Sequence, residues 1–191
     1  VVDKYIDNRG KTPPLSINGI PLIEVKHFDK NSPFPNLRTD KYVSQETFTT
    51  WFRDHIKKND ILISTVGSVG LTSFVFDENL AIAQNVLGLR FSKKFMSLYM
   101  FCLLKNTYFQ RQISSRLVET VQKSIKRKDL NKIPILVPPK EICEKFAEII
   151  IVHLEQQFNN EIQNTVLTNL KKTLQKELVL GKLRFTYNKI T

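Results

Sequence analysis

The hydrophobic pattern of the last third of the chain predicts one long helix. Between the dipeptide Pro138-Pro139 and Gly181 the sequence has no proline or glycine, and apolar residues recur at every fourth position. They are Ile142, Phe146, Ile150, Leu154, Phe158, Ile162, Val166, Leu170, Leu174 and Leu178. At 1.5 Å per residue, a helix of about 40 residues would be about 60 Å long. The rest of the sequence is too short to bury all of these apolar side chains, so the pattern predicts a partner that covers them.

The period of this pattern predicts that the helix has two functional faces. A repeat of four residues drifts by about 40° per step on an ideal helix, which excludes a single straight seam. We expect the part from Ile142 to Leu154 to face the chain's own globular domain. A polar belt follows at Gln156, Gln157, Asn159, Asn160, Gln163 and Asn164. The residues expected to meet the partner are Ile162, Val166, Leu167, Leu170, Leu174 and Leu178.

Upstream of the helix, short apolar runs separated by turn residues predict β-strands. Residues 1–25 are expected to form a strand, a basic turn and a second strand. Residues 61–66 and 71–76 are expected to pair as a hairpin across the segment Gly67-Ser68-Val69-Gly70. Residues 81–91 form a further apolar run, which we expect to extend the same sheet.

The remaining segments predict short helices, a loop and one edge strand. Residues 26–46 are polar and contain prolines, as expected of a variable recognition loop, and residues 47–55 could form a short helix or strand. Ser92 is expected to cap a helix that continues, with a bend, to Ile113. Residues 133–137 are expected to form a last strand at a sheet edge, because Pro134 lacks a backbone N–H group.

Together these patterns predict an α+β fold with a small, mixed, sheet-rich globular domain. The domain is expected to span residues 1–138, the long helix residues 139–183, and a tail residues 184–191. With 41% hydrophobic residues, the chain can fill the core of one ordinary domain with an appendage.

The charge of the chain indicates a polyanionic partner, by preference double-stranded DNA. The sequence holds 29 Lys and Arg against 18 Asp and Glu, a net charge of +11. Residues 111–132 hold seven basic residues against two acidic ones and so supply +5 of that charge. The alternative is a solvated charged loop on a merely soluble basic protein, which is the usual meaning of a charge run.

The cysteines and the hydropathy pattern favour a reducing, cytoplasmic setting. Cys102 and Cys143 do not form a close pair, which is typical of buried or inert thiols. No apolar run approaches the roughly 18 residues that a membrane helix requires, so we expect no membrane association.

Candidate catalytic and metal-binding motifs are weak, and we predict no catalytic residue, no metal and no cofactor. Gly67-Ser68-Val69-Gly70 lacks the Gly-Lys-Ser/Thr of a phosphate-binding P-loop. Asp7, Glu24 and Lys26 superficially resemble the carboxylate and lysine set of metal-dependent nucleases. The proline that usually precedes the first acid is absent, so a chance arrangement is favoured over a nuclease site.

The basic segment is the better candidate for function, because it mixes cations with an amide and a hydroxyl that can contact bases. The Gly67–Gly70 turn could also approach a phosphate with its amides. The residues expected to contact DNA are Arg9, Lys11, Arg38, Lys41, Ser68, Arg116, Gln122, Lys123, Ser124, Lys126, Arg127 and Lys128.

Three stretches, in order along nearly the whole chain, resemble the specificity subunit of type I restriction-modification systems. Residues 10–25 are similar to that family's Arg-Gly-x-Thr-Pro and Ile-Pro-Leu-Ile segments. Residues 59–70 and 81–85 are similar to its Asp-Ile-Leu-Ile-Ser-x-x-Gly-x-x-Gly and Ala-Ile-x-Gln strands. Residues 121–139, with Leu178-x-x-Gly-Lys-Leu at the far end, complete the pattern. The usual Gln after Pro-Pro-Leu-x-Glu is replaced by Cys143.

This resemblance implies a DNA target recognition domain followed by a conserved helical spacer. It implies a non-catalytic protein that reads one half of a bipartite target and directs methyltransferase and restriction subunits. The chain has room for one such unit, so we expect a half-size subunit or a fragment of a full one. A second copy, packed as an antiparallel coiled coil, would supply the missing apolar partner.

Two other classes of function remain open from the residues alone. One is a nuclease that uses Asp7, Glu24 and Lys26, and the other is an interaction module whose helix recruits a protein without DNA. Cleavage of a plasmid in the presence of Mg²⁺ would indicate the nuclease. Binding of duplex DNA would distinguish the specificity subunit from the interaction module.

Overall fold

The computed structural model describes residues 2–29, 31–117 and 123–182. The chain divides into two compact units, Val1–Ile151 and Val152–Thr191. The first unit contains two small β-sheets and several helices, and the second contains the remainder of one long helix.

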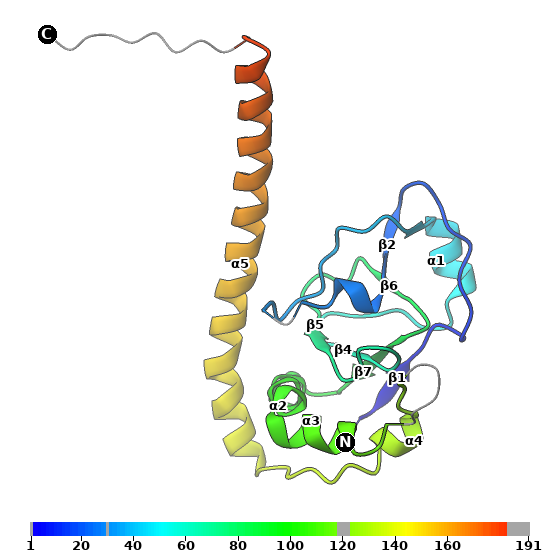
Figure 1. The fold of residues 1–191 in the computed structure, drawn as a ribbon. Coiled ribbons are helices and arrows are strands. Elements are labelled where there is room, and N and C mark those ends of the chain that lie inside the picture. The colour runs from blue at the N-terminus through cyan, green and yellow to red at the C-terminus, as the bar shows by residue number, and fades with distance from the viewer. Residues whose placement is uncertain (1, 30, 118–122, 183–191) are drawn as a thin grey trace, which may run out of the picture. The chain divides into compact units, whose positions relative to one another are not determined.

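The larger sheet has four antiparallel strands in the order β1-β7-β4-β5 (Figure 1). Its strands are β1 (Lys4–Ile6), β4 (Ile61–Ser64), β5 (Thr72–Phe74) and β7 (Val86–Arg90). The predicted hairpin is confirmed, because Ile61 pairs with Phe74 and Ile63 with Thr72. Its second strand is shorter than the predicted 71–76. Every residue of β4, a central strand rich in branched side chains, is buried, and so is every residue of the edge strand β5.

The smaller sheet consists of β3 (Tyr42–Val43), β2 (Ile20–Ile23) and β6 (Ala81–Ile82) in that order. β2 pairs antiparallel with β3 and parallel with β6. The prediction that residues 81–91 extend one sheet is therefore wrong. The polar pair Gln84 and Asn85 forms a turn, so the run divides into β6 in one sheet and β7 in the other. Likewise, the two strands predicted within residues 1–25 exist but belong to different sheets.

Six helical segments complete the described parts of the fold. They are η1 (Val25–His27), α1 (Gln45–Trp51), α2 (Lys94–Lys105), α3 (Thr107–Ser114), α4 (Arg127–Leu130) and α5 (Lys140–Val179). The bend expected before Ile113 lies at Asn106, whose side chain accepts a hydrogen bond from the amide of Tyr108 at 2.8 Å. The prediction that Ser92 caps α2 is wrong. Lys93 occupies that position without a side-chain cap, and the Ser92 amide donates to Asp3 instead.

Residues 134–139 have no regular secondary structure, so the strand predicted at 133–137 is wrong. Pro134, Pro138 and Pro139 cannot donate backbone hydrogen bonds to a neighbouring strand. The carbonyl of Leu136 is instead used by a side chain, the hydroxyl of Tyr99, which donates to it at 2.6 Å.

The long helix α5 spans 40 residues and confirms the predicted element. Within the first unit its buried residues are Cys143 and Ala147, whereas Ile142 is 54% exposed and Ile149 is 61% exposed. The prediction that Ile142 begins the face packed on the domain is therefore wrong by one position. Phe146 meets Tyr99 of α2 edge to face, with ring centroids 6.2 Å apart. Cys143, in place of the family's usual Gln, has a thiol whose pKa is raised by burial.

The second unit leaves the predicted partner-facing side chains uncovered. The exposed fractions of Val166, Leu167 and Leu170 are 59%, 59% and 52%. Ile162, Leu174 and Leu178 are also exposed. Across the ranges that the structure describes, no helix combines the length and apolarity needed to cross a membrane.

Candidate nucleic-acid interface

The basic segment is joined to the end of β4 by backbone hydrogen bonds. Val66 and Ser124 form an antiparallel bridge. The amide of Gly67 donates to the carbonyl of Lys123 at 2.9 Å, and the amide of Ile125 donates to Thr65 at 3.0 Å. These bonds hold Lys123 and Ser124 beside the β4–β5 turn that carries Ser68.

The turn between β6 and β7 lies on the other side of the same segment. The amide and hydroxyl of Thr65 donate to the carbonyl of Asn85 at 2.9 and 3.2 Å. Residues that are far apart in the sequence therefore meet at Thr65. These contacts bring the β4–β5 turn, the β6–β7 turn and the segment of Lys123 and Ser124 to one surface.

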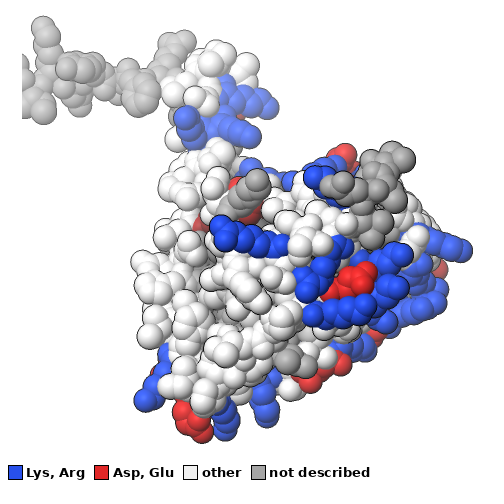
Figure 2. Space-filling model, turned by 60° about the horizontal axis from the view of Figure 1, so that its bottom comes forward, with Lys and Arg blue, Asp and Glu red and all other residues white. Residues whose placement is uncertain are grey.

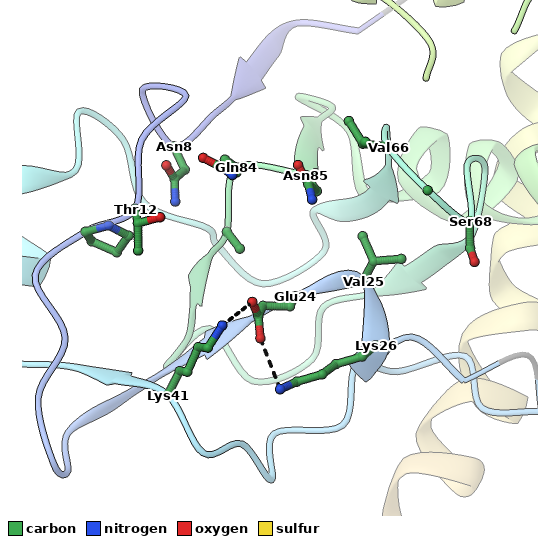
Figure 3. Close-up of a pocket in the computed structure, with 13 residues that line it drawn as sticks. Asn8, Thr12, Glu24, Val25, Lys26, Lys41, Val66, Ser68, Gln84 and Asn85 are labelled. Carbon is green, nitrogen blue, oxygen red and sulfur yellow. Dashed lines mark hydrogen bonds and ion pairs between the residues drawn. The ribbon is translucent and has the colours of Figure 1, made fainter. Parts of the chain in front are cut away.

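A pocket of about 440 Å³ opens where these turns meet the ends of β1 and β2 (Figure 3). Asn8, Gln84 and Asn85 lie along one side of it, and Glu24, Lys26 and Lys41 lie along the other. It is lined by Asn8, Thr12, Pro13, Glu24, Val25, Lys26, Lys41, Val66, Gly67, Ser68, Ala83, Gln84 and Asn85.

The charged groups of the pocket are paired with one another. The carboxylate of Glu24 lies 2.7 Å from the ammonium group of Lys41 and 3.2 Å from that of Lys26, which also lies 2.8 Å from Asp40. Burial alone would raise the pKa of Glu24, but the hydrogen bonds from the two lysines outweigh burial and lower it. The pocket therefore holds two cations whose charge is largely balanced.

A second basic surface is formed by α4 and the residue before it. Lys126, Arg127 and Lys128 are exposed, and Figure 2 shows Lys and Arg side chains gathered over the side of the first unit that carries α4. The guanidinium of Arg127 lies 5.2 Å from the ring centroid of Tyr5. The Tyr5 hydroxyl donates to Asn131. Burial raises the pKa of Tyr5, although Asn131 and Arg127 act in the opposite direction.

Comparison with known proteins matches residues 19–178 to the model of the type I restriction modification DNA specificity domain. The chain belongs to this family. The match begins shortly before β2 and ends one residue before the end of α5, so it covers every described strand except β1 and nearly all of the long helix.

Relatives of this specificity domain include two curated subunits. The chain is 25% identical over 174 residues to the type I restriction enzyme EcoBI specificity subunit of Escherichia coli, covering 87% of the chain and 36% of the relative. It is 29% identical over 86 residues to the MjaIX specificity subunit of Methanocaldococcus jannaschii, covering 45% of the chain and 19% of the relative. The chain thus spans less than half the length of these relatives.

A solved structure shares the fold of this specificity domain. It comes from a study of complex assembly and conformational transition of the type I R-M system. The two chains have a TM-score of 0.50 at 20% identity, over 91% of this chain and 44% of the other. This likeness supports the arrangement of small sheets followed by a long helix.

The structure of the specificity domain brings several predicted contact residues together. Lys41 and Ser68 line the pocket, and Lys123 and Ser124 adjoin the Ser68 turn. The remaining residues lie elsewhere or are engaged. Arg9 stacks on Trp51 at 5.6 Å. Arg116 donates to Gln112 of α3. Lys11 and Arg38 are exposed, and Gln122 lies outside the described residues.

Sequence reasoning missed the amide side chains of Asn8, Gln84 and Asn85. For Gln84 and Asn85, the sign in the sequence is a polar pair inside the otherwise apolar run 81–91. Nothing in the sequence around Asn8 indicates its place in the pocket. A tertiary contact fixes it there, because its Nδ2 donates a hydrogen bond to the carbonyl of Ile82 at 2.7 Å.

The residues of the nuclease alternative do not assemble into a metal site. Glu24 and Lys26 form an ion pair, and Asp7 accepts a hydrogen bond from the Arg9 amide at 3.3 Å. Within the described ranges, no group of three or more His, Cys, Asp and Glu side chains could hold a metal ion. Neither the contacts nor the comparisons support the nuclease reading.

Proposed function

We propose that this chain is the DNA sequence-recognition component of a type I restriction-modification system, acting in the cytoplasm. Residues 1–138 serve as a target recognition domain that reads one half of a bipartite target. Residues 139–183 serve as a spacer helix. The chain directs partner methyltransferase and restriction subunits and performs no catalysis itself.

The observation that carries this proposal is a set of unpaired cations in the segment that adjoins one rim of a polar pocket. Lys123, Lys126 and Lys128 are exposed, and within the described residues none of them lies within ion-pair distance of a carboxylate. Unpaired lysines contact DNA phosphates without sequence preference, whereas neighbouring neutral side chains can contact bases. The juxtaposition of the two kinds of group fits sequence-specific binding of duplex DNA.

Replacing Arg127 and Lys128 together with Ala is expected to weaken binding to all duplexes alike, by about tenfold or more at low salt. If both contact phosphates, the slope of log affinity against log salt should fall by about 2. Fluorescence anisotropy with labelled duplexes at several salt concentrations measures both quantities.

The matched control for this experiment is Lys93→Ala with Lys94→Ala, an exposed pair at the start of α2 that removes the same net charge. An equal loss of affinity in the control would show that only net charge matters. Absence of any duplex binding by the unmodified chain would support the interaction-module alternative. Cleavage of a plasmid by the pure chain with Mg²⁺ would support the nuclease alternative.

Tyr5→Leu is expected to lower DNA affinity by about two- to fivefold, because a cation–π contact that orients Arg127 is lost. In the Arg127→Ala background the same change should have no further effect. Tyr5→Phe keeps the ring and serves as the control. Anisotropy titrations of the four variants form a double-mutant cycle, and additive losses would contradict a positioning role for Tyr5.

We further propose that the second unit pairs with a second copy of itself, helix antiparallel to helix. Exposed apolar side chains at Ile162, Val166 and Leu170 would lose their contact with water on pairing. An isologous pair would relate two recognition domains by a twofold axis, as the reading of two half-sites requires.

A further inference from the structure

The pocket between the β4–β5 and β6–β7 turns divides its polar groups into two kinds. Its charged groups, Glu24, Lys26 and Lys41, satisfy one another. Among its neutral side chains, those of Thr12, Ser68 and Gln84 form no hydrogen bond within the described residues. We propose that this pocket reads the edge of a base pair in the major groove and that Gln84 is the residue that contacts adenine. The inference rests on the proposed function and assigns part of it to a residue outside the basic segment.

The charge balance argues against phosphate as the occupant of the pocket. Lys41 and Lys26 both contact Glu24, and Lys26 also contacts Asp40. A phosphate would have to compete with these carboxylates for both cations and would be repelled by the carboxylate of Glu24. The lysines without such partners lie outside the pocket: Lys123 adjoins the turn of Ser68, and Lys126 and Lys128 belong to the surface of α4. The backbone of the DNA therefore fits the surroundings of the pocket, and the pocket itself fits uncharged groups.

The neutral groups are available for hydrogen bonds with a ligand. Among the described residues, the side chains of Thr12, Ser68 and Gln84 form no hydrogen bond within the chain, and all three are exposed at the pocket. Side-chain amides and hydroxyls offer both donors and acceptors. The edge of a base pair presents the same mixture, which a phosphate does not.

The turn that carries Gln84 is held in place by hydrogen bonds from three parts of the chain. Asn8 donates to the carbonyl of Ile82 at 2.7 Å, and the amide of Ala83 donates to Ile23 at 2.9 Å. Thr65 donates twice to the carbonyl of Asn85. A turn anchored on both flanks presents its exposed side chain with little loss of backbone freedom on binding.

The chemistry of Gln84 selects the base. A glutamine amide can accept from N6 and donate to N7 of adenine at the same time, a pairing that no other base offers in the major groove. Loss of one such pair is expected to reduce discrimination by roughly tenfold at a single position of the target. Glutamate at the same position can only accept, and it favours the N4 amino group of cytosine.

The test is selection of bound duplexes from a random library by the full chain, followed by sequencing. Gln84→Ala is expected to lose an adenine preference at one position and to keep its affinity for unrelated duplexes. Gln84→Glu is expected to shift that position toward cytosine. Gln45→Ala removes an exposed glutamine of α1 outside the pocket and should leave the selected sequence unchanged. Urea unfolding of each variant checks that the fold is retained.

The outcomes separate this inference from the proposed function. If Gln84→Ala selects the same sequence as the unmodified chain, or weakens binding to every duplex equally, Gln84 does not read a base and the inference is wrong while the proposed function stands. If the unmodified chain binds DNA but selects no sequence, both are wrong.

Discussion

Replacing Leu170 and Leu174 with lysine is expected to convert the proposed dimer to a monomer. Both side chains are exposed on the second unit, at 52% and 43%, and on pairing their apolar surface would be buried. Lysine at each position would place a charge in that contact, and loss of a central apolar anchor costs about 2 kcal/mol or more. Each copy of the dimer carries both substitutions, so association is expected to weaken by about a thousandfold or more. Light scattering should show the mass falling from twice 22.2 kDa to 22.2 kDa.

The control is Thr165→Lys with Thr168→Lys, which adds the same charge on the opposite side of the helix. Both threonines are exposed, so this variant should keep the dimer mass. A single-chain mass for the unmodified protein at high concentration would refute pairing with a second copy. Its DNA binding would then have to be explained by one recognition domain alone.

Arg90→Ala is expected to lower the free energy of unfolding by about 3–5 kcal/mol, the largest effect on stability that we predict. Arg90 donates from Nε and Nη2 to the two oxygens of Asp60 at 2.9 and 2.6 Å, and also to the carbonyl of His55 at 2.7 Å. The Asp60 side chain is only 2% exposed. Its charge would remain buried without its cation, which costs more than the pair itself contributes.

Urea unfolding followed by circular dichroism measures this loss. Arg53→Ala removes an exposed arginine of the same unit and should change the stability by less than about 0.5 kcal/mol. Arg90→Lys keeps the charge but loses the two-pronged contact, so an intermediate loss is expected. If Arg90→Ala were as stable as Arg53→Ala, the pair would contribute nothing to the fold.

Local features of the fold were accessible from the sequence because their causes are local. The β4–β5 hairpin follows from two β-rich runs on either side of Gly67 and Gly70, and both glycines adopt positive φ angles of 78° and 89°. Such angles are unfavourable for residues with a Cβ atom, so the glycines identify the turn. The sheet that each half of residues 81–91 joins is not determined by local sequence. Only the pairing of Ala81 with Leu22 and of Leu89 with Ile61 decides which sheet each half joins.

The candidate site shows the same division. The sequence indicated that Ser68 and Lys123 have the chemistry for DNA, but a backbone bond across more than fifty residues places them together. It also placed Glu24 in the disfavoured nuclease alternative and Lys41 among the DNA contacts. The structure pairs these two side chains with each other at 2.7 Å. Residue type is a property of the chain, whereas the partner of a charge depends on which strands lie side by side.

The long helix shows most clearly which features the sequence determines and which features tertiary packing determines. Its existence and length are determined by the sequence alone, because no proline or glycine interrupts residues 140–180 and the helical hydrogen bonds need no other part of the chain. The rotation of the helix about its own axis is not determined by the sequence alone. Tertiary packing against α2 buries Cys143 and exposes Ile142, one position away from the face that a period of four selects. Rotation of a helix about its axis leaves its internal hydrogen bonds unchanged, so only contacts with the rest of the domain decide which side is covered.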